Sequence, residues 1–231
     1  MSTESALGSF ADRRVALLHT SFITTHSVVE DLCRELLPGA EVLNLVDDSL
    51  VTEVFAKGKV DANITRRVCL QVMAAESAGA EVILGVCNSV TEAVETASRL
   101  ASVPVVLIDE PMAEKLVREA SRVGVVGTSW LSASSLARLI KRKAAEAGRE
   151  VAVTQRVSRE AFEAIRVGDF VTHDRLVVAE VRRLAPEVDA IALSQGSMAR
   201  VLPLLADLDR PIFTSPRLAV ERVREVLAAG V

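Results

Sequence analysis

The stretch that decides the fold is Val82–Val90, VILGVCNSV. Its first five residues are apolar or glycine with β-branched residues leading, as in a strand buried on both faces. Cys87, Asn88 and Ser89 follow, and the sequence then changes to the helical run TEAVETASRL. Glu92 stands three residues after Ser89, a spacing that predicts a capping box at a helix start. The stretch therefore predicts a buried strand, a short polar turn and a helix.

Cys87 is the residue of chemical interest in this turn. It is expected at the carboxyl end of a parallel strand, against the amino end of a helix, where open α/β sheets bind their ligands. Such a helix end favours anions, whether the carboxylate of a ligand or the thiolate itself. The alternative is an inert cysteine in the core, because free cysteines are among the most buried residues. The turn thus indicates a site for a small anion.

Composition excludes several classes of function. The 231 residues suffice for one large domain or two lobes of about 100 residues each, and half of them are hydrophobic. A net charge of −4, with 3% aromatic residues and no Tyr, argues against nucleic-acid or anionic-membrane partners. The leading residues lack the apolar core of a signal peptide, and three cysteines do not make a disulfide framework. Cys and His spacing supports no metal site. A cytoplasmic protein is expected.

Apolar segments alternate with amphipathic ones along the whole chain. This alternation predicts parallel βαβ units. A loop is expected around Lys57 and Gly58, and a capping box of Ser27 and Glu30 opens the first helix. The predicted strands are residues 15–18, 42–46, 82–86, 103–108, 123–126, 151–153, 190–193 and 211–213. The predicted helices are residues 27–37, 61–78, 90–100, 112–121, 129–147, 159–166, 171–184, a segment after 198, and 216–229.

The two halves of the chain repeat each other. VALLHTSF at 15–22 resembles VGVVGTSW at 123–130, and VILGVCNSV resembles AIALSQGSM. Thr20 then matches Thr128, and Cys87 matches Gln195, at one and the same offset along the chain. Chance similarity between generic strands is the alternative to duplication. We expect an α/β fold of two pseudo-symmetric Rossmann-like lobes, 12–111 and 112–215, with parallel sheets and an inter-lobe cleft at their strand ends.

A duplicated α/β unit with C-N-S after a strand in the first half and a G-T-S turn opening the second resembles the aspartate/glutamate racemase superfamily. Hydantoin racemases, maleate isomerase and arylmalonate decarboxylase are also members. The resemblance implies a dimer without cofactor, in which one cysteine from each half faces the substrate Cα. It implies Cys87 as acid/base and packing of helix 216–231 on the first lobe. The carboxylate ligands it implies are Asn88, Ser89, Thr128 and Ser129.

Gln195 departs from the pattern of these relatives. Where they have a second cysteine, in a segment like L-G-C-A-G-M, this chain has L-S-Q-G-S-M. Gln has no titratable proton, whereas two-base racemisation needs one group on each face of the substrate carbon. Gly196 and Ser197 continue the same turn and are assigned to substrate binding, with no counterpart there of the histidine found in glutamate racemases.

Further polar residues end the predicted strands. His19 is expected to face the cleft, where it binds a second polar group or shuttles a proton; a hydrogen-bonded wall histidine is the alternative. Thr20 and Ser21 follow it as substrate ligands. His26 and His173, at helix starts, are expected on the surface, and Cys33 and Cys69 in the packing. Strand-end carboxylates can set the charge of Cys87 or serve as caps: Asp47, Asp48, Asp109 and Glu110.

The leading functional hypothesis is a cofactor-independent isomerase acting at the carbon next to the carboxylate of a small acid. Cys87 would be the acid/base, and backbone N–H groups would stabilise an enediolate-like intermediate. The first alternative is a one-base decarboxylase or C–C lyase of the same superfamily. The second is a carboxylate-binding protein without catalysis.

Overall fold

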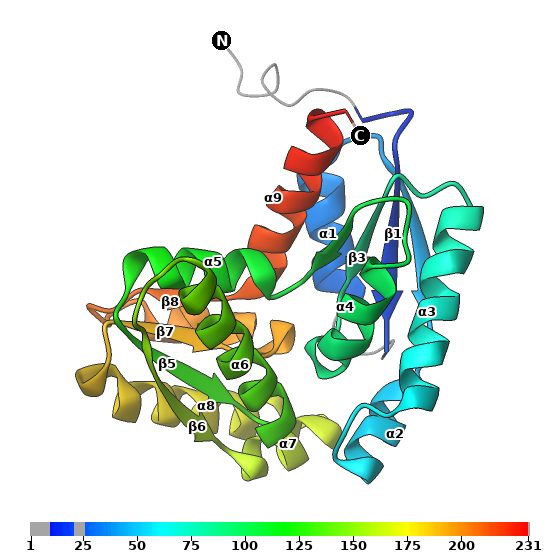
Figure 1. Ribbon diagram of the computed structural model, residues 1–231. Coiled ribbons are helices and arrows are strands. Elements are labelled where there is room, and N and C mark those ends of the chain that lie inside the picture. Colours follow the sequence, from blue (N-terminus) through cyan, green and yellow to red (C-terminus); the bar gives the residue numbers. More distant parts are fainter. Residues whose placement is uncertain (1–9, 21–25, 231) are drawn as a thin grey trace. The chain divides into compact units, whose positions relative to one another are not determined.

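The computed structural model describes residues 10–20 and 26–230 of the chain (Figure 1). The chain forms two compact units, one of Met1–Ile108 with Pro216–Val231 and one of Asp109–Ser215. Each unit is an α/β sandwich and is described by itself. None of the helices in the described ranges is both long and apolar enough to cross a membrane.

The first unit contains a four-stranded parallel sheet with strand order β2-β1-β3-β4. The order arises because each strand connects to its parallel neighbour through a helix, as the alternating pattern of the sequence predicts. Its strands are β1 (Arg14–His19), β2 (Glu41–Val46), β3 (Val82–Gly85) and β4 (Val105–Leu107). Its helices are α1 (His26–Leu36), α2 (Ser49–Lys57), α3 (Ala62–Ser77), α4 (Thr91–Ser98) and α9 (Ser215–Ala228).

The second unit repeats this plan with strand order β6-β5-β7-β8, again all parallel. Two parallel sheets of the same order confirm the predicted α/β fold class. The strands are β5 (Arg122–Gly127), β6 (Ala152–Val157), β7 (Ala190–Leu193) and β8 (Ile212–Phe213). The helices are α5 (Glu110–Glu119), α6 (Trp130–Glu146), α7 (Arg159–Arg166) and α8 (Phe170–Leu184).

The repeat extends to individual hydrogen bonds at the amino ends of the strands. In the first unit the backbone N–H of Glu81 donates to the carbonyl of Arg14 at 2.9 Å, and the Glu81 carboxylate accepts from the Arg14 N–H at 3.1 Å. In the second unit Asp189 and Arg122, which stand at the matching positions of the repeat, form the same two bonds at 2.8 and 2.9 Å. Such matching of both backbone and side-chain bonds supports duplication over chance similarity.

Helix α9 completes the core of the first unit. Val15 and Leu17 of β1 are two residues apart and therefore lie on the same face of the sheet, the face that α1 and α9 cover (Figure 1). Val220 and Val223 of α9 belong to the same apolar cluster as these two side chains. Two hydrogen bonds of 2.8 and 3.0 Å join Arg217 of α9 to Glu35 of α1. On the opposite face, α3 and α4 lie side by side, and α4 packs so closely that a Cβ on Gly85 would lie 2.9 Å from Val94.

Three local predictions differ from the structure. The loop expected around Lys57 is largely helix α2, which buries Leu50 and Val54 at helical spacing and ends at Gly58 with φ of 65°. The lysine–glycine pair thus marks a helix end, because glycine adopts a left-handed C-cap at no steric cost. The segment predicted as a helix after residue 198 is helical, but it is a 3₁₀ helix that already begins at Gly196. His173 is fully buried, not on the surface, and contacts Asp174 at 2.8 Å through Nδ1.

Candidate active site at the strand ends

The last sheet bond of each unit places Cys87 and Gln195 at equivalent positions. The backbone N–H of Val86 donates to the carbonyl of Leu18 at 3.0 Å, and the matching bond, from Ser194 to Val126, measures 2.9 Å. In each unit the next residue leaves the sheet with extended backbone and begins a 3₁₀ helix. Cys87 and Gln195 therefore both stand at the carboxyl edge of a parallel sheet, the edge where α/β proteins bind ligands.

The turn at Cys87 differs in detail from the prediction. A 3₁₀ turn, Asn88–Val90, separates the cysteine from α4, and the N-cap of α4 is Val90. Glu92 is consequently the second residue of the helix rather than the third, so the predicted capping box does not form the helix start. The Thr91 hydroxyl donates to the carbonyl of Asn88 at 2.9 Å instead. Cys87 is half-exposed, whereas its neighbours Asn88 and Ser89 are buried.

His19 ends β1 as a buried side chain with a defined orientation. Its Nε2 lies 3.0 Å from Oδ1 of Asn44, and the Asn44 amino group donates to the carboxylate of Glu30. Because the carboxylate accepts and the amide NH₂ donates, the Asn44 oxygen faces His19, and Nε2 carries a proton. Glu30 is thus hydrogen-bonded to Asn44 of β2. The side chain of Ser27, the capping partner predicted for Glu30, lies outside the described residues. Ser21, a predicted substrate ligand, lies outside them too.

Thr20 follows His19 and is 3% exposed. Within the described part of the chain its hydroxyl has no hydrogen-bond partner. A buried hydroxyl without a partner costs free energy, on the order of 1–3 kcal/mol, so it marks a position where a ligand or water oxygen would be stabilised.

Thr128 occupies the matching position in the second unit, and both of its donors are engaged. Its backbone N–H donates to Oε1 of Gln195 at 2.8 Å, and its hydroxyl donates to the same oxygen at 3.0 Å. Ser129 is buried at the N-cap of α6, and Gly196 and Ser197 follow Gln195 as half-buried residues. The structure therefore brings Thr128 and Gln195 into direct contact.

Gly127 stands where the first unit has His19. A Cβ at this glycine would lie 2.5 Å from the Ser194 hydroxyl oxygen and 3.2 Å from the Ala133 Cβ, so no side chain fits. The two strand ends therefore share their backbone but differ in chemistry, with a histidine and a thiol in one unit and a glycine and an amide in the other.

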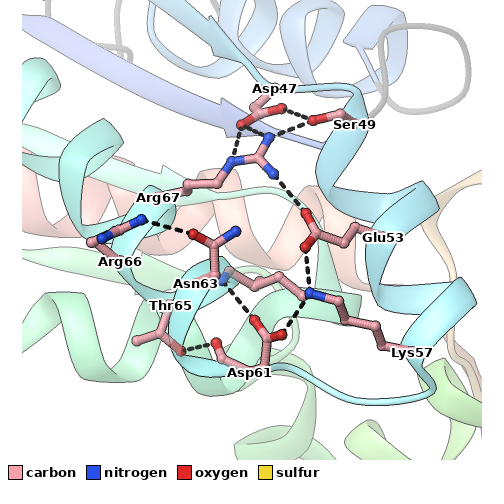
Figure 2. Close-up of polar contacts among 10 residues, drawn as sticks. Asp47, Ser49, Glu53, Lys57, Asp61, Asn63, Thr65, Arg66 and Arg67 are labelled. Carbon is pink, nitrogen blue, oxygen red and sulfur yellow. Dashed lines mark hydrogen bonds and ion pairs between the residues drawn. The ribbon is translucent and has the colours of Figure 1, made fainter.

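Asp47, at the end of β2, belongs to an ion network rather than to the Cys87 turn. Figure 2 shows Arg67 of α3 donating to Asp47 and to Glu53 of α2, at 3.0 and 2.7 Å. Lys57 bonds to the carboxylates of Glu53 and Asp61. Burial alone would raise the pKa of Asp47, but hydrogen bonds from Ser49 and Arg67 outweigh it and hold the pKa below its ordinary value. The network fastens α2 to α3.

Arg67 is expected to control access to Cys87, because α2 packs against the 3₁₀ turn that follows this cysteine. Replacing Arg67 with Met should lower the free energy of unfolding by about 1 kcal/mol, since the ion pairs are partly exposed. It should also loosen α2 and speed Cys87 alkylation. Urea unfolding and timed iodoacetamide labelling measure the two effects. Arg66→Met is the matched control, because Arg66 bonds to Asn63 on the exposed side of α3; equal effects of both variants would contradict the expectation.

The three cysteines are free and differ in exposure. Cys33 is buried in the core of the first unit, and burial raises its pKa to about 12. Cys69 on α3 is partly buried, so packing covers it less completely than Cys33.

Iodoacetamide should therefore modify Cys87 and Cys69 in the native protein and leave Cys33 unmodified. A Cys69→Ser variant removes the other accessible thiol, and mass spectrometry of tryptic peptides then reports the rate at each remaining cysteine. Modification of Cys33 ahead of Cys87 would contradict the assignment of the strand-end thiol as the reactive one.

Two parallel sheets of one order, each ending in a polar turn, define a duplicated α/β protein with a candidate site at the strand ends. Within residues 10–20 and 26–230, no group of three His, Cys, Asp or Glu side chains is arranged to hold a metal ion. Residues 18–223 match the family described as Asp/Glu/Hydantoin racemase, and the chain belongs to this family.

Solved structures of similar proteins share the fold. An aspartate racemase homologue from Pyrococcus horikoshii OT3 is 14% identical, with 94% of this chain and 99% of that chain covered and a TM-score of 0.71. An allantoin racemase from Klebsiella pneumoniae is 20% identical, with 95% and 89% covered and a TM-score of 0.68. A glycine-to-cysteine mutant of arylmalonate decarboxylase, in a sulfate-associated form, is 14% identical, with 94% of each chain covered and a TM-score of 0.63. No curated protein matches the sequence.

Proposed function

We propose that this chain is a cofactor-independent enzyme that acts at the carbon next to the carboxylate of a small acid, with Cys87 as the acid/base. The observation that carries the proposal is the half-exposed thiol of Cys87 at the carboxyl edge of the first sheet, in a chain of the racemase family. A thiol is a chemical group suited to proton transfer, and the strand-end location is where this fold class binds ligands.

The proton transfer requires a developing negative charge to be stabilised. The Cys87 thiolate takes the proton from Cα, so the C–H bond breaks and an S–H bond forms. The electron pair passes into the carboxylate as an enediolate, and the thiol then returns a proton to the same carbon. Backbone N–H groups of the turn Asn88–Val90 are suited to hold the enediolate oxygens, and they need no cofactor for this.

The second unit supplies a reason to place an oxygen of the acid at Thr20. There, the N–H and the hydroxyl of Thr128 hold the amide oxygen of Gln195. The first unit has Cys87 in place of the glutamine, and a cysteine side chain ends before the position of that oxygen. The Thr20 hydroxyl, buried and without a partner in the described residues, is thus available for a ligand oxygen. In this proposal Thr128 positions Gln195 and does not bind the ligand carboxylate itself.

His19 is the second titratable side chain at this strand end. The chain of hydrogen bonds through Asn44 to Glu30 fixes its ring and places the proton on Nε2. With the proton on Nε2, Nδ1 of the neutral ring is an acceptor, so we assign His19 to taking up a proton there and returning it, because histidine exchanges protons near neutral pH.

One-base chemistry is the form of the reaction that these residues favour. Gln195 has no proton to give or take in the neutral pH range, so Cys87 acts on one face of the carbon. A decarboxylase or C–C lyase, in which Cys87 protonates the carbanion left by bond cleavage, is therefore the second candidate. A carboxylate-binding protein without catalysis is the third.

Deuterium exchange separates the three candidates. The protein is incubated in D₂O with single enantiomers of allantoin, aspartate and glutamate, and with an arylmalonate, and Cα–H signals and optical rotation are followed by NMR and polarimetry. Deuterium wash-in with retention of configuration supports one-base chemistry, and racemisation supports the isomerase. Loss of CO₂ supports the lyase. Binding without exchange or cleavage would replace the enzyme by a binding protein.

A further inference from the structure

We infer that Gln195 determines ligand specificity, because its amide is anchored on Thr128 at the carboxyl edge of the second sheet and keeps its NH₂ group for an oxygen acceptor of a small acid. The inference rests on the proposed function in one respect, that the ligand is a small acid. It assigns to Gln195 a role in recognition and none in proton transfer.

The orientation of the Gln195 amide is fixed by the chemistry of its partner. A backbone N–H can only donate, so the side-chain atom 2.8 Å from the Thr128 nitrogen is the amide oxygen. The Thr128 hydroxyl donates to the same oxygen at 3.0 Å. A flipped amide would place NH₂ against a backbone N–H, which costs a hydrogen bond and leaves a buried donor unpaired. The two lone pairs of the oxygen are both used, and the remaining capacity of the side chain is two N–H donors.

These donors remain accessible. Thr128 is 2% exposed, whereas Gln195 is half-exposed. In the ranges that the structure describes, neither Gln195 N–H donates to a protein acceptor. The side chain is therefore anchored at its buried oxygen and open at its nitrogen. Because the side chain is already held in one conformation, it loses less conformational entropy on binding a ligand than a flexible glutamine would.

An NH₂ group fixed in this way selects among acids. It stabilises a carboxylate, carbonyl or ureido oxygen and disfavours an ammonium group, which is itself only a donor. The preferred ligands are therefore small acids that carry a second oxygen acceptor at this position. Since the amide does not titrate, this preference is independent of pH across the neutral range.

The experiment measures binding, so it does not depend on turnover. The probes are phenylmalonate, allantoin and L-alanine, of which only L-alanine lacks a second oxygen acceptor. The side-chain NH₂ signals of Gln195 are assigned in ¹⁵N NMR spectra by their loss in Gln195→Glu. At least one oxygen-rich probe, phenylmalonate or allantoin, is expected to shift these signals downfield and to bind more tightly than L-alanine. Absence of any shift with all three probes would overturn the inference.

Gln195→Glu tests the NH₂ group alone, because it preserves the contact with Thr128. A glutamate can still accept both Thr128 hydrogen bonds, but it presents an oxygen where the NH₂ was. The Kd of phenylmalonate should rise about tenfold or more, as expected when a hydrogen bond to a charged acceptor is lost and repulsion is added. Gln155→Glu is the matched control: Gln155 accepts a hydroxyl bond from Ser134 at 3.3 Å on β6, and its substitution adds the same charge to the same unit. Equal Kd values for wild type and Gln195→Glu would overturn the inference.

Thr128 variants test the anchor. Thr128→Val removes the hydroxyl donor but keeps the backbone N–H, so it should broaden the Gln195 NH₂ signals and weaken binding several-fold, and Thr128→Ser should restore both. A merely structural threonine would leave these signals unchanged. Two results separate this inference from the proposed function. Loss of exchange in Cys87→Ser with unaltered probe binding supports the proposed reaction and does not test recognition by Gln195. Unaltered probe binding in Gln195→Glu contradicts recognition by Gln195 and does not test the reaction.

Discussion

Cys87→Ala is expected to reduce deuterium exchange at Cα by roughly 10³-fold or more, because it removes the group that takes and returns the proton. Cys87→Ser should be nearly as inactive, since an alcohol does not ionise near neutral pH. The rate of loss of the Cα–H signal in D₂O, with the acid identified by the exchange screen, gives the measurement.

The controls for this experiment are inside the same chain. Cys69→Ser removes a half-exposed thiol on α3 and should leave exchange unchanged. The binding affinity for the acid should also survive Cys87→Ala, because the oxygens are held by N–H and hydroxyl groups. Exchange that persists in Cys87→Ala would remove Cys87 from the mechanism.

Gln195→Cys is expected to create proton exchange on the second face, so that one enantiomer of the acid is converted to the other where the wild type forms none. The gain should be about 10²-fold over the rate of inversion without enzyme, the lower end of general acid–base effects. The physical reason is that the backbone at position 195 repeats that at Cys87, with last sheet bonds of 2.9 and 3.0 Å in the two units. The substitution also frees the Thr128 N–H and hydroxyl for a ligand oxygen, as at Thr20.

Gln195→Ser separates these two consequences. It removes the glutamine NH₂ and frees Thr128 in the same way but supplies no thiol, so it should bind the acid as Gln195→Cys does and form no antipode. Chiral chromatography of the acid after incubation distinguishes the variants. If Gln195→Cys binds the acid as tightly as Gln195→Ser does and still forms no antipode, the pocket is built for another reaction, and the lyase or the binding protein takes the place of the isomerase.

The sequence predicts the framework well, because buried strands are continuous apolar runs. Strand β7 and helix α7 have the predicted bounds, 190–193 and 159–166, since each is flanked by charged or turn residues. The internal repeat predicts that both units share one strand order, and the hydrogen bonds of Glu81 and Asp189 follow from the same alignment of the halves.

Features that depend on tertiary neighbours were not predictable in this way. The bond between Thr128 and Gln195 joins residues far apart in the sequence, and only the sheet register brings them together. His173 looks like an exposed helix start in sequence, yet it is fully buried in α8, a helix that packs against α7. Helix α2 is too short for its pattern to stand out, and the ion network centred on Arg67 holds it in place (Figure 2).

The placement of α9 has a consequence for how this protein comes into being on the ribosome. The first unit lacks Val220 and Val223 until residues 215–228 have been synthesised, whereas the second unit is continuous in sequence. At ordinary rates of translation, the intervening 109–215 take roughly 5–20 s to make. During that time the sheet face that carries Val15 and Leu17 is not yet covered by α9. The first unit therefore begins to be synthesised first but completes its core last. A nascent chain stalled before residue 215 therefore exposes an apolar sheet face to chaperones and to other nascent chains.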